Sequence, residues 1–131
     1  MIVWGPAESN GFFSKPVSIM RRRAGLGAPL SGQPGPFSLS SRDTLTRLYE
    51  DAGFVDVRFE LSEAPLRLPR AADCLAFERE SFGALHQMLS GLKEAEKIAA
   101  WDEVASELCK FEGPNGFEAP CVMVIAVGTK P

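Results

Sequence analysis

The stretch Phe37–Glu60 reads FSLSSRDTLTRLYEDAGFVDVRFE and predicts a complete helix, turn and strand from local signals alone. A serine of the type that caps helices is followed by apolar residues at spacings of three and four, which place one stripe on a helix. These residues are Ser40, Leu45, Leu48, Tyr49 and Ala52. Gly53 ends the helix, because glycine adopts a left-handed backbone at little cost.

Beyond Gly53 the period of the apolar residues changes from about four to two. Val55, Val57, Phe59 and Leu61 alternate with polar residues. This alternation is typical of a strand with one buried face. We therefore expect an amphipathic helix followed directly by a half-buried strand.

The order of helix, Ala-Gly-Phe and strand resembles a segment near the C-terminus of class I S-adenosylmethionine-dependent methyltransferases, the group that acts on small molecules. Upstream, MIVWGPAESNGFF (1–13) resembles the fifth sheet strand of that family and the loop after it. Downstream, CVMVIAVGTKP (121–131) resembles the last strand. The resemblance covers nearly the whole chain but only the C-terminal half of the family's domain.

The resemblance implies an α+β fold with a small mixed three-stranded sheet, which is part of the Rossmann-like methyltransferase fold. Its order would be the N-terminal strand, the C-terminal strand and then Val55–Leu61, with the middle strand antiparallel to its neighbours. Because Cys121–Val127 is an unbroken apolar run, we expect that strand to be buried on both faces.

The cofactor-binding features of the family have no counterpart in this sequence. These are a first strand, a glycine-rich turn and an acidic residue that ends the second strand. The single G-x-G, Gly25-Leu26-Gly27, follows Arg21–Arg23 rather than an apolar strand and leads into Ala28-Pro29 rather than a helix. This context indicates an ordinary turn. We therefore expect no S-adenosylmethionine to bind the isolated chain, and whether the chain is an enzyme stays open.

The remaining segments predict one long loop and a helical hairpin. Eleven Gly and Pro residues fall within Gly5–Pro36, so we expect at most a short helix there, around Val17–Ala24. The resemblance implies that this loop helps to close over the methyl acceptor. Two further apolar stripes at helical spacing predict the antiparallel hairpin. They consist of Leu75, Phe82, Leu85 and Leu89, and of Ile98, Trp101, Ala105, Leu108 and Phe111, and a turn at Gly113–Gly116 ends the hairpin.

Composition limits the classes of protein to consider. The 131 residues fit a single domain over positions 1–131, with 45% hydrophobic residues and a net charge of -3. The charge disfavours nucleic acid as a partner, and no apolar run reaches the roughly 20 residues of a membrane helix. Three scattered cysteines and no secretory signal indicate a cytoplasmic protein with reduced thiols.

Four residues are the candidate substrate-binding positions. Trp4 ends a strand at its carboxyl edge, where α/β sheets place their ligands, and Asn10, Phe12 and Phe13 follow in the next loop. We predict no catalytic residue and no metal ligand. The single histidine, His86, has no nucleophile at an interpretable spacing, and the acidic residues fall on the polar helix faces. Those acids are Glu78, Glu80, Glu94, Glu96, Asp102, Glu103 and Glu107.

Two functions remain open from the sequence. The first is a truncated methyltransferase-like domain without methyl-transfer activity of its own. The alternative is a free-standing module, built on the same fold, that binds a small apolar ligand or dimerises. Either way we expect a homodimer, because the free edge of Ile2–Trp4 and a bared sheet surface need a partner. The edge strands would pair, or the Gly5–Pro36 loop would exchange between copies.

Overall fold

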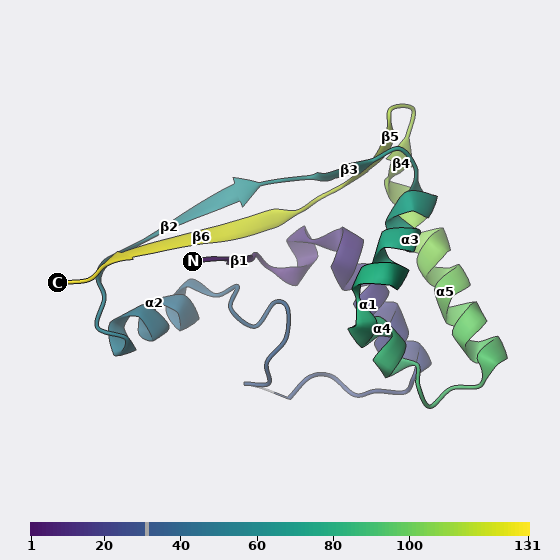
Figure 1. Ribbon diagram of the computed structural model, residues 1–131, viewed down its shortest axis with the longest axis horizontal. Coiled ribbons are helices and arrows are strands. Elements are labelled where there is room, and N and C mark those ends of the chain that lie inside the picture. Colours follow the sequence, from purple (N-terminus) through teal and green to yellow (C-terminus); the bar gives the residue numbers. More distant parts are fainter. Residues whose placement is uncertain (31) are drawn as a thin grey trace. The chain divides into compact units, whose positions relative to one another are not determined.

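The computed structural model describes residues 1–30 and 32–131 and contains both helices and strands (Figure 1). The sequence predicted a single domain, and the structure divides the chain into two compact units, which are described one at a time. Unit 1 comprises Met1–Asn10, Leu30–Pro65 and Pro120–Pro131. Unit 2 comprises Gly11–Pro29 and Leu66–Ala119.

Unit 1 is built on a three-stranded sheet. Strand β6 (Val122–Thr129) lies between β1 (Ile2–Trp4) and β2 (Val55–Glu63) and is antiparallel to both. The predicted strand order is therefore confirmed. The sheet was predicted to be mixed, and this prediction is wrong, because each pair of neighbouring strands in it is antiparallel.

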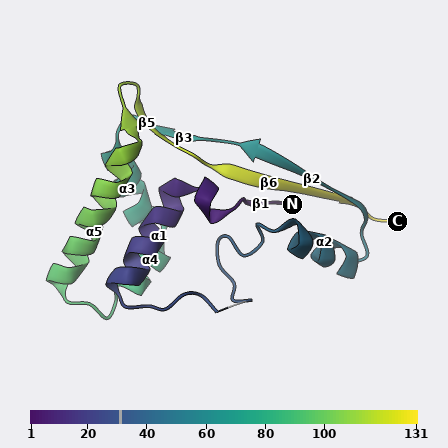
Figure 2. The same ribbon diagram turned by 180° about the vertical axis from the view of Figure 1, so that it is seen from behind.

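One face of this sheet is covered by helix α2 (Arg42–Asp51), which Figure 2 shows alongside β1 and β6. Leu45 and Tyr49 of the helix pack against Val124 and Ala126 of β6. Gly53 follows with a φ of 79°, as expected for the residue that ends the helix. The helix, glycine and strand predicted from Phe37–Glu60 are thus confirmed. The predicted cap is wrong, because Ser41 rather than Ser40 precedes the helix, and it makes no side-chain capping hydrogen bond.

The other face of the sheet, which we call the second face, points away from α2. Residues that pair across antiparallel strands share a face, so Ile2 and Ile125 lie on it, as do Arg58 and Val127. Ile2 and Val127 are 61% and 59% exposed. The prediction that β6 is buried on both faces is therefore wrong, because unit 1 supplies one helical layer and its sheet needs two.

Unit 2 contains four helices and a second small sheet. The helices are α1 (Gly11–Arg23), α3 (Ala71–Ser81), α4 (Gly83–Met88) and α5 (Glu94–Leu108). The strands are β3 (Leu66–Leu68), β4 (Glu112–Gly113) and β5 (Gly116–Ala119), in the antiparallel order β3-β5-β4. Short 3₁₀ turns at Ala7–Ser9 in unit 1 and Cys109–Phe111 in unit 2 complete the secondary structure.

Two expectations about unit 2 are corrected. Helix α1 has 13 residues and contains Pro16, so the first part of Gly5–Pro36 is regular structure rather than loop. The stripe from Leu75 to Leu89, predicted as one helix, belongs to two helices that meet at Phe82. The turn predicted at Gly113–Gly116 is confirmed, and it joins β4 to β5 in a β-hairpin.

The buried stripe of α5 is also shifted from the predicted one. It consists of Ala100, Trp101, Val104 and Leu108. Ile98, which the sequence placed in the stripe, is 55% exposed. Trp101 and Leu108 belong to both stripes, whereas Val104 takes the place that Ala105 was expected to hold.

Candidate functional site

The carboxyl ends of β1 and β2 lie at the same end of the unit 1 sheet. Both strands are antiparallel to β6, so they run in the same direction and end beside the first residues of β6. Ligands of open α/β sheets bind beyond the carboxyl ends of the strands. This end of the sheet is therefore the first place to look for a site.

An open hollow of about 360 Å³ lies here, on the α2 side of the sheet. Leu61, Val122 and Val124 give it an apolar floor. Its polar rim comes from Ser9, Ser40, Arg42 and Glu63. We call this set, with Pro6, the carboxyl-end hollow. Apolar walls with a few polar groups are the usual lining of a small-molecule site.

Arg42 supplies the positive charge at the rim of the carboxyl-end hollow. It is the first residue of α2, and its guanidinium carbon lies 5.7 Å from the centroid of the Phe59 ring. Glu63, the last residue of β2, supplies the opposite charge at the same rim. The hollow thus presents a hydrogen-bond donor, a carboxylate and hydroxyl groups around an apolar floor, which suits a small organic molecule with polar substituents.

Asn10 is hydrogen-bonded to residues that line this hollow but is not itself part of its lining. Its side chain is fully buried, and its amide nitrogen donates to the carbonyl oxygens of Pro6 (2.9 Å) and Val122 (3.1 Å). Its amide oxygen accepts a hydrogen bond from the Val122 N–H at 3.0 Å. Both amide donors are therefore used within the protein, and the residue fixes the turn after β1 against the start of β6.

The structure separates the other predicted site residues. Trp4 is half-buried and lines a groove of about 350 Å³ together with Gly35, Pro36 and Leu39. Phe12 and Phe13 are buried in α1 of unit 2, where the Phe13 ring centroid lies 4.3 Å from that of Phe82. Trp4 and Asn10 belong to unit 1, and the two phenylalanines belong to unit 2.

Sequence reasoning missed the polar residues of the carboxyl-end hollow. Ser40 was assigned only a helix-capping role, and Arg42 and Glu63 were given no role. The available signal was positional: the start of α2 follows the loop after β1, and Glu63 lies where β2 ends. Such positions converge only when the strand order is known.

A second hollow, of about 370 Å³, lies at the opposite end of the unit 1 sheet. It is mostly apolar, and its lining residues come from Met1, from the C-terminal part of α2 and the turn after it, and from β6. They include Leu48, Tyr49, Ala52, Phe54, Ala126 and Val127. The hydroxyl of Tyr49 donates to the carbonyl oxygen of Ala126 at 2.7 Å, so its polar group is satisfied.

Unit 2 contains a buried carboxyl group, that of Glu78. The residue is fully buried on α3, and burial raises the pKa of its carboxyl to about 8. The sequence interpretation that placed Glu78 on a solvated helix face is therefore wrong. By contrast, His86 lies on α4 with its Nε2 2.8 Å from the carbonyl oxygen of Arg79 and its ring centroid 5.2 Å from that of Trp101.

Among residues 1–30 and 32–131, no group of three His, Cys, Asp or Glu side chains is placed to hold a metal ion. None of the helices in the described part combines the length and the hydropathy that crossing a bilayer requires. No protein-family model matches the sequence, and a search of curated proteins found no relative.

Proposed function

We propose that this chain is the acceptor-side, C-terminal part of a class I S-adenosylmethionine-dependent methyltransferase, without methyl-transfer activity of its own. The observation that carries the proposal is the strand order β1-β6-β2 with β6 antiparallel to both neighbours. The resemblance in the sequence implies this order. The unit of α2, Gly53 and β2 stands at the position in the chain that the resemblance gives it.

The residues of this chain do not fit the cofactor. Gly25 and Gly27 follow the C-terminus of α1 rather than a strand, and residues 24–30 form no helix after them. A loop that binds the cofactor needs a strand before it and a helix after it. In this proposal the cofactor-binding residues belong to the other half of the domain, and this chain supplies only groups that hold and orient the methyl acceptor.

The carboxyl-end hollow is the acceptor site in this proposal. Its apolar floor would hold the body of a small organic acceptor, and Arg42 and Glu63 would orient polar substituents through hydrogen bonds. Arg42→Ala and Glu63→Ala should therefore weaken acceptor binding in the complete enzyme. Both residues are exposed, so neither change should alter the free energy of unfolding by more than about 0.5 kcal/mol.

Calorimetric titration of S-adenosylmethionine into the isolated chain is the first test. We expect no measurable heat of binding, because the contacts that bind the cofactor in the resembling family come from the other half of the domain. A dissociation constant in the micromolar range would contradict the proposal. Repeating the titration with Gly25→Ala and Gly27→Ala would then show whether the turn after α1 binds the cofactor.

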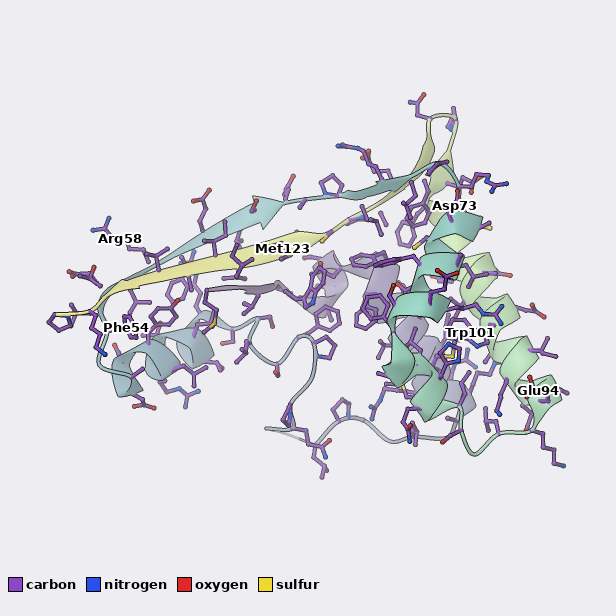
Figure 3. The ribbon with its side chains drawn as sticks, viewed as in Figure 1. Phe54, Arg58, Asp73, Glu94, Trp101 and Met123 are labelled. Atoms are coloured by element: carbon purple, nitrogen blue, oxygen red, sulfur yellow. The ribbon has the colours of Figure 1, made fainter. Side chains whose placement is uncertain are left out.

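The alternative function is a free-standing assembly module, and the second face of the sheet supports it. Ile2, Ile125 and Val127 form an apolar row there, and β2 adds Arg58 and Glu60 beside it. Figure 3 shows Arg58 pointing away from the side on which Phe54 and α2 lie. Apolar rows of this kind on a soluble protein commonly mark an interface.

We infer that a second copy would pack on this face through a two-fold axis that crosses the strands. Such an axis places Arg58 of one copy opposite Glu60 of the other, and Ile125 opposite Val127. The two-fold symmetry therefore forms the pair of Arg58 and Glu60 twice, once with each copy supplying the arginine. Pairing through the edge of β1 is less favoured, because Gly35, Pro36 and Leu39 line a groove with that strand.

Light scattering at tens of micromolar tests the dimer. We expect twice the mass of the chain, a single-chain mass for Arg58→Glu and for Glu60→Arg, and recovery of the double mass when both changes are combined. Arg47→Glu is the matched control, since Arg47 is exposed on α2 and lies off the second face. A single-chain mass for the unmodified protein, or no effect of Arg58→Glu, would exclude this dimer.

The apolar hollow beside α2 suits the other form of the alternative, a small apolar ligand. Leu48, Ala52 and Phe54 present apolar atoms to it. A fluorescent apolar dye added to the chain should bind there and be displaced when Ala52→Trp fills the hollow. Dye binding that survives this substitution would place the ligand elsewhere.

A further inference from the structure

Helix α3 buries a carboxyl group where a helix ordinarily buries an apolar side chain. Its buried stripe is Ala71, Cys74 and Glu78, at spacings of three and four. Cys74 and Glu78 are fully buried and Ala71 is 3% exposed. Carboxylates are almost never fully buried unless a partner compensates their charge.

Glu78 has no such partner in the described part of the chain. Both carboxyl oxygens are buried and make no hydrogen bond there. The nearest titratable neighbour is Cys74, one turn earlier, and burial raises the pKa of its thiol to about 12, so the thiol stays neutral. Burial likewise raises the pKa of the Glu78 carboxyl to about 8, so the acid is mostly protonated at neutral pH.

The charged groups around α3 are engaged elsewhere. The helix packs on α4, α5, β3 and the 3₁₀ turn Cys109–Phe111. The bases on these elements and on α3 pair with other groups: Arg67 with Glu118, Arg70 with Asp73, Lys97 with Glu94, Lys110 with Glu107, and Arg79 with the Trp101 ring. Lys93, which precedes α5, is exposed. His86 contacts the Arg79 carbonyl oxygen.

The acids and the remaining thiol are also accounted for. Glu103 pairs with Arg22 and Arg23 of α1, Glu107 also with Lys15 of α1, and Glu112 accepts from the Ala71 N–H. Glu80, Asp102 and Cys109 are exposed. Within the described residues, therefore, neither carboxyl oxygen of Glu78 accepts a hydrogen bond, and the charged groups on the neighbouring elements are paired with other groups or exposed.

We propose that Glu78 is a proton-dependent switch in unit 2, which keeps α3 packed on α5 while it is protonated and releases α3 when it ionises. An ionised carboxylate at this position has either to admit water or to leave the helix interface. Because Cys74 and Glu78 lie on one stripe, both outcomes separate that stripe from its neighbours. The segment that opens is α3, and unit 1 takes no part in the change.

Hydrogen exchange of backbone amides at pH 6 and pH 9 tests the switch, after correction for the intrinsic effect of pH on exchange. In the unmodified protein we expect the protection of the α3 amides to fall by about tenfold or more at the higher pH. The amides of β6 should keep their protection. Glu78→Gln keeps the shape of the side chain but does not ionise, so its α3 protection should be the same at both pH values. Glu80→Gln, on the exposed side of the same helix, should behave like the unmodified protein.

Two further measurements keep the proposal testable if Glu78→Gln folds poorly. Glu78→Met is apolar and of similar length, and it should also remove the pH effect. Carbon NMR of the labelled Glu78 carboxyl in the unmodified protein should show a titration midpoint near 8. A midpoint near the ordinary 4.5, equal protection of α3 at both pH values, or an unchanged pH effect in Glu78→Gln would each overturn the proposal.

Discussion

Asn10 holds the turn after β1 to β6 through hydrogen bonds to Pro6 and Val122. Asn10→Ala removes the side chain and leaves the Val122 N–H without its acceptor, whereas the carbonyl oxygens of Pro6 and Val122 still accept from the Ser9 and Gly5 N–H groups. We expect the free energy of unfolding to fall by about 1–3 kcal/mol. Glu8→Ala, in the same turn but exposed, should stay within about 0.5 kcal/mol. Urea denaturation measures both, and equal losses would mean that Asn10 does not fix the turn.

The buried Glu78 makes stability depend on pH in a defined direction. Its pKa in the folded protein, about 8, lies above the ordinary value of 4.5, so the folded state holds the proton more tightly than the unfolded state. Stability is therefore greatest below about pH 4.5 and is lost as pH rises toward 8. The loss is on the order of 4 kcal/mol. Denaturation midpoints measured from pH 5 to 9 should fall in the unmodified protein and stay level in Glu78→Gln.

At the scale of elements, the register of α5 is the most testable correction to the sequence analysis. Leu108 is fully buried and Ile98 is 55% exposed, although both were predicted to share one stripe. Leu108→Ala should cost about 2–4 kcal/mol, whereas Ile98→Ala should cost less than about 1 kcal/mol. Thermal or urea denaturation of the two variants compares them directly. A large loss for Ile98→Ala would restore the predicted stripe.

Glycine at position 53 is the other feature at this scale. Its φ of 79° is left-handed, and no neighbouring atom lies within 4 Å of an added Cβ. Gly53→Ala should therefore destabilise unit 1 by about 1–2 kcal/mol through backbone strain alone. Gly35→Ala, where the backbone is not left-handed and the space is also open, is the control. Equal effects would show that strain at the end of α2 is not the cause.

The sequence predicted the elements whose signals are local. The stripe of α2, the glycine after it and the alternation of β2 lie within Phe37–Glu60, so nothing distant was needed to find them. Only the second half of helix α1 was predicted, around Val17–Ala24, because the glycines and prolines before it outweighed the apolar spacing of its first half. Glu78 was missed because its charge suggested solvent, and only the packing of the α3 face shows that the residue is buried.

The candidate site was predicted less well than the fold. Trp4 ends β1 and Asn10 follows it, but neither residue is among those that line the carboxyl-end hollow. Arg42 and Glu63 come from other parts of the chain, and their convergence depends on the order β1-β6-β2. Phe12 and Phe13 lie on α1 in unit 2, where both side chains are buried as core residues. Sequence position alone did not separate core aromatic residues from site residues.

At the scale of the whole molecule, we propose that this chain is the acceptor side of a methyltransferase. The two functions differ in what lies upstream of the Met1 codon. An acceptor-side part requires an in-frame segment with a strand, a glycine-rich turn and an acidic residue ending a second strand. An assembly module requires none of these, and its dimer mass does not depend on them.

The most direct measurement is a calorimetric titration of S-adenosylmethionine into the chain extended at its N-terminus by the in-frame upstream residues. The proposal predicts saturable binding by the extended protein and none by residues 1–131 alone. It further predicts that Arg42→Ala in the extended protein leaves cofactor affinity unchanged, since Arg42 lies at the rim of the carboxyl-end hollow. An upstream sequence without the glycine-rich turn, or an extended protein that does not bind the cofactor, would contradict the account.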